Sequence, residues 1–240
     1  QPICRIRSSS CGCRRVSVAS LTLVRVCTAN VCTLHPREDH ASKCQSEGFA
    51  TTGRAQALEM MFQSEGVDIV GIQEGRLTSS IRQGVHYHMY IDSPDVTGNH
   101  GGQVWIRSLL KPQLKAAISH SDRIFEVQAF LKAKACDAVV FTAHAPTEGA
   151  PASDKELFWD KLLSVVCSAR KRAPDATFVF TIDANARVGS NVTGSIGSYQ
   201  IEQENDNGAR FRTFLDTAGL WAINSFTDAG TTWRGKGGVG

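Results

Sequence analysis

The segment that decides the fold of this 240-residue chain is Asp68–Glu74, with the sequence DIVGIQE. Its β-branched and apolar residues predict a buried strand over 67–73, and a carboxylate, Glu74, follows at the strand's end. Upstream, residues 53–66 have apolar side chains at helical spacing and predict a helix. The face of that helix expected to be buried consists of Ala55, Leu58, Met61 and Phe62.

Short strands and helices alternate along the rest of the chain. Ser153 and Glu156 have the spacing of a capping box and predict a helix that starts at Ser153 and closes at Pro174. A second helix is expected over 207–218, with Gly219 as its stop. The expected strands are 21–28, 87–92, 102–107, 113–118, 124–133, 138–144, 177–182 and 220–226, with a further start at 231–233.

The balance of these elements indicates the fold class. Residues 85–144 contain several strands but lack the intervening helices that a doubly wound parallel sheet needs. We therefore expect an α/β (α+β) fold with two packed, mostly antiparallel β-sheets flanked by helices, a four-layer α/β sandwich.

Composition and chain length place limits on the class of protein. Hydrophobic residues make up 42% and charged residues 20%, as in soluble folded proteins, and the net charge is a mild +3. No apolar stretch is long enough to span a membrane. We expect residues 1–20, which carry four Arg and no acid, to form a disordered basic leader, and 21–240 to form one domain.

The cysteines and the N-terminal region bear on the compartment. Eight cysteines without zinc-ligand spacing indicate free thiols in a reducing compartment. Residues 16–24 loosely resemble a signal peptide, but Arg25 interrupts them, so we expect a nuclear or cytoplasmic protein that is not secreted. A thiol-based site is a weaker hypothesis, because no orienting Asp or Asn stands out. Its candidate residues would be Cys27, Cys32 or Cys44 with His35 or His40.

Polar residues follow three of the expected strands. These are Asn30, Glu74, and the pair Asp183 and Asn185. Such residues from distant segments can converge on one rim of a sandwich and build a site there. Oxygen ligands suit Mg²⁺ or Mn²⁺, and such an ion with a carboxylate that positions water supports phosphodiester hydrolysis.

Several blocks of the sequence together resemble the endonuclease/exonuclease/phosphatase superfamily. They are TANV (28–31), DIVGIQE (68–74), AHAPT (143–147) and IDANARVG (182–189), supported by 101–102, 207–208, 224–226 and 231–233. Their order and spacing match the family over about 21–233. The sequences of these blocks are most similar to those of the endonuclease domain of non-LTR retrotransposons, which resembles apurinic/apyrimidinic endonucleases.

The resemblance implies a role for each site residue. Glu74 matches the principal metal ligand, and Asn30 matches an amide that fixes the site near the metal. Asp183 matches the carboxylate that activates or orients water, and Asn185 the amide that orients this Asp and the phosphate. His144 stands where a Tyr usually contacts the phosphate, and an imidazole can also donate a hydrogen bond there.

The sequence also departs from the family pattern. Cys32 stands where the repair enzymes carry an Asp, which argues against a repair function. The last His is His144 and no Asp follows Asp228, so the family's closing strands and Asp-His pair have no counterpart. We therefore expect the domain to be truncated at its C-terminus, with unpaired sheet edges, low stability and little or no activity.

These observations favour a Mg²⁺- or Mn²⁺-dependent endonuclease module of a retroelement that nicks DNA. Its expected partners are DNA and a downstream reverse transcriptase on the same polyprotein. One alternative is a phosphatase or phosphodiesterase of the same superfamily that acts on a phospholipid, an inositol phosphate or a nucleotide. Another is a degenerate, non-catalytic remnant that at most binds nucleic acid.

Overall fold

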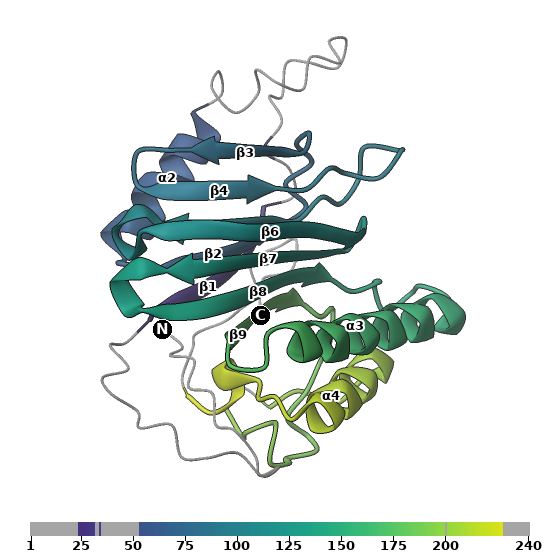
Figure 1. Cartoon of the computed structure of the whole chain (residues 1–240). Helices are drawn as coiled ribbons and strands as arrows, with labels where there is room; N and C mark the ends of the chain where they lie inside the picture. The colour runs from purple at the N-terminus through teal and green to yellow at the C-terminus, as the bar shows by residue number, and fades with distance from the viewer. Residues whose placement is uncertain (1–23, 32–33, 35–52, 200, 228–240) are drawn as a thin grey trace.

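The structure, a computed structural model, describes residues 24–31, 34, 53–199 and 201–227. Within these residues two β-sheets pack face to face, and helices lie on their outer sides (Figure 1). This confirms the expected four-layer sandwich. Predictions about the leader 1–20, about 231–233 and about part of the thiol-based site concern residues outside the described part of the chain; for the thiol-based site these are Cys32, His35, His40 and Cys44.

The first sheet has five strands in the order β1-β2-β5-β4-β3. β1 pairs with β2 in parallel, and the other neighbours are antiparallel. Helix α2 covers the outer face, where Phe62 packs edge-on against Trp105. The elements are β1 (Val26–Asn30), α2 (Arg54–Ser64), β2 (Ile69–Gln73), β3 (Ser80–Gln83), β4 (Tyr87–Ile91) and β5 (Gln103–Arg107).

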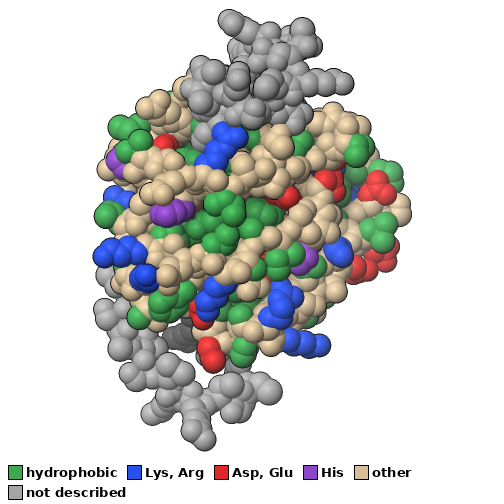
Figure 2. All heavy atoms as spheres, turned by 45° about the horizontal axis from the view of Figure 1, so that its top comes forward, with side chains coloured by type: hydrophobic (Ala, Val, Ile, Leu, Met, Phe, Trp, Pro, Cys, Tyr) green, Lys and Arg blue, Asp and Glu red, His purple; other side chains and the backbone are tan. Residues whose placement is uncertain are grey.

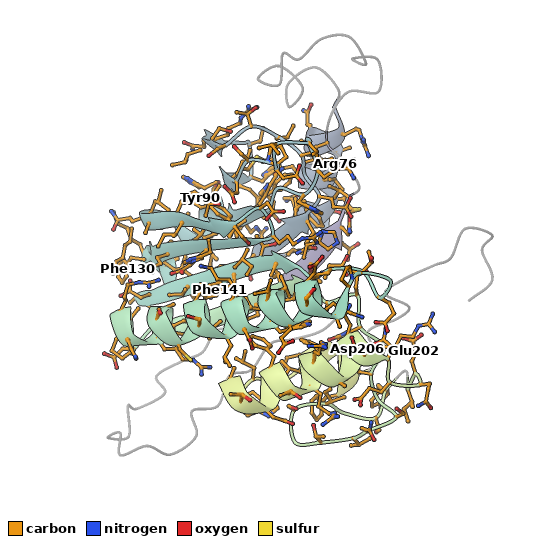
Figure 3. All side chains as sticks on the ribbon, turned by 90° about the vertical axis from the view of Figure 1, so that its right-hand side faces the viewer. Arg76, Tyr90, Phe130, Phe141, Glu202 and Asp206 are labelled. Atoms are coloured by element: carbon orange, nitrogen blue, oxygen red, sulfur yellow. The ribbon has the colours of Figure 1, made fainter. Side chains whose placement is uncertain are left out.

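The second sheet has four strands in the order β6-β7-β8-β9, and only the β8–β9 pair is parallel. Helices α3 and α4 pack together on its outer face (Figure 3). The helical spacing of apolar residues predicts one buried face for α3, and that face is buried against the sheet; its residues are Phe158, Leu162, Val165, Val166 and Ala169. The elements are β6 (Pro112–Ser121), β7 (Ile124–Leu131), β8 (Cys136–His144), α3 (Ala152–Arg172), β9 (Thr177–Asp183) and α4 (Asp206–Ala218), with short 3-10 turns at Ser108–Leu110, Lys132–Lys134 and Ile223–Ser225.

The inner faces of both sheets form a shared apolar core. Ile69, Val104 and Ile106 of the first sheet meet Val127 and Val140 of the second. The sheets lie close together at Gly71 in β2, where an added Cβ would lie 1.7 Å from Thr181 Oγ1. This position therefore requires glycine, and the close approach brings the ends of β2 and β9 together.

Two local predictions were wrong at helices. Helix α3 begins at Ala152 after Pro151, and Ser153 lies inside its first turn with its hydroxyl 3.4 Å from Asp154 Oδ1. Pro151 supplies the fixed φ that starts the helix, so the expected capping box does not form. On α2, Met61 is 49% exposed.

A buried carboxylate takes the place of Met61 in the packing of α2. Glu59 is 4% exposed and accepts hydrogen bonds from the backbone N–H groups of His86 and Tyr87. A carboxylate that accepts two backbone bonds can be buried, which an apolar pattern alone does not reveal.

The expected strand over 220–226 was also wrong. Only Ala222 makes a β-bridge, to Ile196, and Ile223–Ser225 forms a 3-10 turn. The Ser225 hydroxyl stabilises that turn because it donates to Ala222 O at 2.6 Å.

Strand β3 was not predicted. Of the described cysteines, Cys27, Cys136 and Cys167 are free. None of the described helices is long and apolar enough to cross a membrane.

Candidate active site

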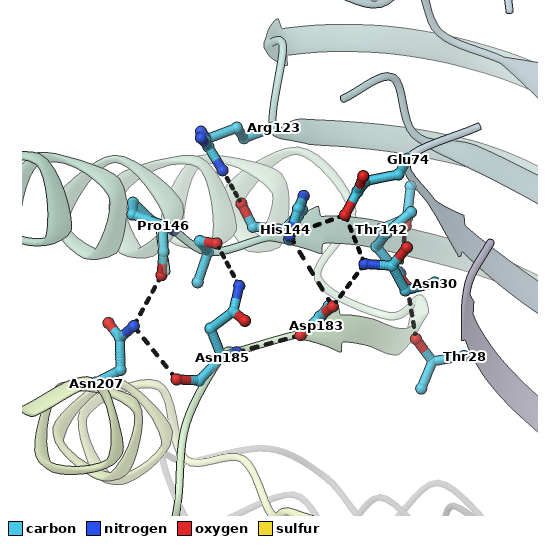
Figure 4. Close-up of polar contacts among 12 residues, drawn as sticks. Thr28, Asn30, Glu74, Arg123, Thr142, His144, Pro146, Asp183, Asn185 and Asn207 are labelled. Atoms are coloured by element: carbon cyan, nitrogen blue, oxygen red, sulfur yellow. Dashed lines mark hydrogen bonds and ion pairs between the residues drawn. The ribbon is translucent and has the colours of Figure 1, made fainter. Parts of the chain in front are cut away.

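Four strand ends from the two sheets meet at one edge of the sandwich. The parallel pairs β1–β2 and β8–β9 bring Asn30 level with Gln73, and His144 level with Asp183. Glu74 follows Gln73 directly. Asn30 and Asp183 are the last residues of their strands rather than the first residues after them. The four predicted residues Asn30, Glu74, His144 and Asp183 therefore lie together (Figure 4).

Asn30 connects the two carboxylates of the site. Its Nδ2 donates to Glu74 Oε1 at 2.8 Å and to Asp183 Oδ2 at 2.9 Å (Figure 4). These residues lie 44 and 153 positions from Asn30 in the sequence. One amide thus holds an oxygen of each carboxylate within reach of a common point between the sheets.

Glu74 is held by its backbone and by Arg76. Glu74 and Arg76 both have left-handed φ values, 55° and 54°, which are uncommon for such residues. Arg76 Nη2 lies 2.7 Å from Glu74 Oε2. Burial alone would raise the pKa of Glu74, but the hydrogen bonds from Asn30 and Arg76 outweigh it and lower that pKa below its ordinary value. Glu74 is therefore ionised at neutral pH.

His144 faces both carboxylates without bonding to them. Its Nε2 lies 3.7 Å from Glu74 Oε1 and 4.0 Å from Asp183 Oδ2, beyond hydrogen-bond range. Burial lowers the pKa of His144 although both carboxylates act to raise it, so the ring is neutral at neutral pH. Arg123 Nη1 donates to the His144 carbonyl at 3.2 Å, and the His100 ring packs edge-on against the His144 ring at 5.5 Å.

Asn185 lies in the loop after β9, with a left-handed φ of 46°. Its backbone N–H donates to Asp183 Oδ1 at 3.2 Å, and its side-chain amide donates to Ala145 O at 2.9 Å. The contact with Asp183 is thus made by the backbone, while the side chain ties the β9 loop to the end of β8. Asn, like Asp, adopts this backbone conformation more readily than most residues.

Gln73 links the sheets directly beneath the site and was not predicted as a site residue. It is 1% exposed; its Nε2 donates to Thr142 Oγ1 and to Thr181 O, and its Oε1 accepts from Thr28 Oγ1. These bonds join β2 to β8, β9 and β1. The available sequence signal was a lone amide in an otherwise apolar strand, because a buried amide needs partners.

Asn207 supports the loops that carry Asn185. This fully buried residue donates through Nδ2 to Pro146 O at 2.8 Å and to Asn185 O at 3.4 Å, and it accepts from Trp159 Nε1 at 3.3 Å. Asn205 caps α4 by accepting from Gly208 N, and it also accepts from Arg187 N. The start of α4 therefore fixes the loop that follows Asp183.

A small cavity opens beside Glu74 and His144, with a volume of about 10 Å³, enough for one water molecule. His100, Asp122 and Arg123 also line it. Next to it lies a larger cleft of about 370 Å³. Arg123 lines both, and Lys161 adds a second cation to the larger cleft.

On the face shown in Figure 2, Lys and Arg side chains gather mainly at the left and lower parts.

The donor set fits a hard divalent cation. The Glu74 carboxylate is ionised, and Asp183 lies across the Asn30 amide from it. Mg²⁺ and Mn²⁺ prefer such oxygen ligands. Arg76 forms an ion pair with one oxygen of Glu74. An ionised carboxylate offers about four lone-pair sites, so Glu74 can still coordinate a metal ion.

No protein-family model matches the sequence, and no curated protein sequence matches it. Solved structures do match. The endonuclease domain of TRAS1, a telomere-specific non-LTR retrotransposon, is similar with a TM-score of 0.50 and 16% identity, over 82% of this chain and 71% of that chain.

A second match is the AP endonuclease LMAP from Leishmania major, with a TM-score of 0.52 and 12% identity, over 81% of this chain and 66% of that chain. The chain has the endonuclease/exonuclease/phosphatase fold. This confirms the fold that the sequence blocks indicated. At these identities the likeness establishes the fold, and the activity is argued from the site.

Proposed function

We propose that this chain is a metal-dependent phosphodiesterase module that nicks DNA, of the kind found in retroelements. The observation that carries the proposal is the single amide of Asn30, which bonds to both Glu74 and Asp183 where four strands end. Two carboxylates held around one point, with a neutral imidazole facing both, suit the hydrolysis of a phosphodiester.

Each residue has a role in this proposal. Glu74, with Asn30 beside it, would hold Mg²⁺ or Mn²⁺, which neutralises charge on the phosphoryl oxygens when bound. Asp183 positions the attacking water and accepts its proton. His144 is neutral and keeps one ring N–H, which donates to a phosphate oxygen. Asn185 holds Asp183 through its backbone N–H and thereby orients the carboxylate.

DNA is the substrate that we favour. The cleft beside the site is lined by Arg123 and Lys161, whose charges suit the phosphate groups of DNA, together with the single carboxylate of Asp154. The block IDANARVG and the likeness to the TRAS1 domain add support for a retroelement endonuclease and hence for a linked reverse transcriptase. A small phosphorylated substrate would need the same metal residues as DNA. Measuring which of the two substrates competes better for the site therefore separates the two hypotheses.

The metal site is tested by Mn²⁺ titration followed by electron paramagnetic resonance. Glu74→Gln keeps the size of the side chain and removes its charge, and we expect it to weaken one Mn²⁺ site at least tenfold. Glu156→Gln is the matched control, because Glu156 is exposed on α3. If the Glu74→Gln variant and the unsubstituted chain bind Mn²⁺ with equal affinity, the proposal that Glu74 holds the metal ion is refuted.

The reaction is tested on supercoiled plasmid with the chain in excess. Because Asn30 holds Glu74 and Asp183 around one point, we expect nicking that needs Mg²⁺ or Mn²⁺. Asp183→Asn should reduce it by a factor of about 100 or more, whereas Asp160→Asn, an exposed change on α3, should leave it intact. If the chain binds Mn²⁺ but nicks the plasmid no faster than the Asp183→Asn variant does, the proposed nuclease activity is refuted. That result would favour a non-catalytic remnant that binds metal.

A further inference from the structure

A second group of metal-type side chains lies close to His144. Asp95, His100 and Asp122 each place one ligand atom within 4.8 Å of the other two. Asp95 and His100 belong to the connection between β4 and β5, and Asp122 lies in the turn between β6 and β7. None of the three belongs to the family blocks that identified the first site.

The Asp95 side chain is pre-oriented by its own turn. Its Oδ1 accepts three hydrogen bonds, from Thr97 N, Thr97 Oγ1 and Asn99 N, at 2.6–2.9 Å. That turn uses only one of the two oxygens. The other, Oδ2, faces His100 Nε2 at 3.7 Å. A carboxylate held through one oxygen, with the second directed at an imidazole, is the arrangement that orients a metal ligand.

The His100 imidazole lacks hydrogen-bond partners within the described residues. Its Nδ1 is buried and unpaired, and its Nε2 lies 3.7 Å from Asp95 Oδ2 and 3.8 Å from Asp122 Oδ2, too far for hydrogen bonds. A largely buried imidazole without any bond is costly. His100 also has a left-handed φ of 65°, and its carbonyl accepts from Arg76 N, so its position is fixed by the backbone.

We propose that Asp95, His100 and Asp122 bind a divalent transition-metal ion, best matched by Zn²⁺, at a site separate from Glu74. An imidazole with two carboxylates suits Zn²⁺, whereas Mg²⁺ prefers oxygen ligands alone. Zinc sites with three protein ligands keep a fourth position for water. The small cavity lined by His100 and Asp122 gives that position access to solvent.

The spacing of the donors supports this assignment. Ligands bonded to one tetrahedral ion at about 2.1 Å lie about 3.4 Å from each other. The distances of 3.7 Å and 3.8 Å from His100 Nε2 are close to that value and too long for direct bonds. Arg123 Nε lies 3.9 Å from the same Asp122 oxygen, so no tight ion pair takes that ligand away.

The bound ion would join two segments that flank the active site. It would tie the β4–β5 connection to the β6–β7 turn, and so fix the His100 ring that packs against His144 at 5.5 Å. In this arrangement the second ion positions the wall of the site and takes no part in cleavage. The proposal does not depend on the function proposed above.

Cobalt serves as the probe, because four-coordinate Co²⁺ absorbs visible light strongly. The Glu74→Gln variant weakens the first metal site, and in it we expect one equivalent of tightly bound Co²⁺ with visible bands, displaced by Zn²⁺. Adding Asp122→Asn should weaken this binding at least tenfold. His100→Asn should do the same, since Asn tolerates the left-handed φ at this position. Asp160→Asn is the matched control and should leave binding unchanged.

The outcomes separate this site from the cysteines of the chain. Thiolate ligands give Co²⁺ an intense near-ultraviolet charge-transfer band, which the proposed nitrogen and oxygen ligands do not. Binding that shows the thiolate band and persists in Glu74→Gln/Asp122→Asn would overturn the proposal, as would no visible Co²⁺ spectrum in Glu74→Gln. A Zn²⁺-dependent rise in Tm that is lost with Asp122→Asn would support it, because a ligand that binds the folded state stabilises it.

Discussion

Gln73 offers the sharpest test of how the two sheets are joined beneath the site. Gln73→Met keeps the length and nearly the volume of the side chain, so it creates little cavity. It removes two buried hydrogen bonds, to Thr142 and Thr181, and a part-buried one from Thr28, with lengths of 2.9, 3.0 and 3.1 Å. At about 1 kcal/mol per bond, the free energy of unfolding should fall by about 3 kcal/mol.

The assay is urea unfolding, in which the midpoint falls while the slope stays constant. Gln83→Met is the matched control, because Gln83 lies exposed on β3 in the same sheet, and it should change stability by less than about 0.5 kcal/mol. Glu74 follows Gln73 directly, so the Mn²⁺ affinity of Gln73→Met should fall as well, by a factor of about 10. A loss of less than about 1 kcal/mol, or one equal to that of Gln83→Met, would refute the cross-link.

Three further predictions follow from single positions. Gly71→Ala should cost about 3 kcal/mol in urea unfolding, because its Cβ would lie 1.7 Å from Thr181 Oγ1, whereas Gly194→Ala, in open space, should be nearly neutral. Asn205→Ala should cost about 1 kcal/mol through the lost cap of α4, and an unchanged midpoint would contradict it. The pKa of Glu74 is lowered on folding, so it stabilises the fold above its ordinary pKa of about 4.3 and that stabilisation is lost as pH falls through the folded pKa. Glu74→Gln should therefore lose less stability than the unsubstituted chain between about pH 5 and pH 3, measured by the urea midpoint, and an equal loss would count against the lowered pKa.

Much of the architecture could be predicted from local pattern. The apolar run before Glu74, the stripe of α3 and the stop at Gly219 all give the elements that the structure contains. Local signals failed where two of them competed. Pro151 outweighed the capping box at Ser153, and the hydroxyl of Ser225 stabilised a turn in place of an expected strand.

The sequence by itself determined which polar residues stand at strand ends: Asn30, Glu74, His144 and Asp183. The tertiary structure alone decided how they meet, because strand pairing joins residues that are far apart in the chain. That Asn30 bonds both carboxylates depends on the register of β1 with β2 and on the contact between the sheets. The group of Asp95, His100 and Asp122 arises in the same way, from two connections on different sheets, and has no spacing signal that a sequence could display.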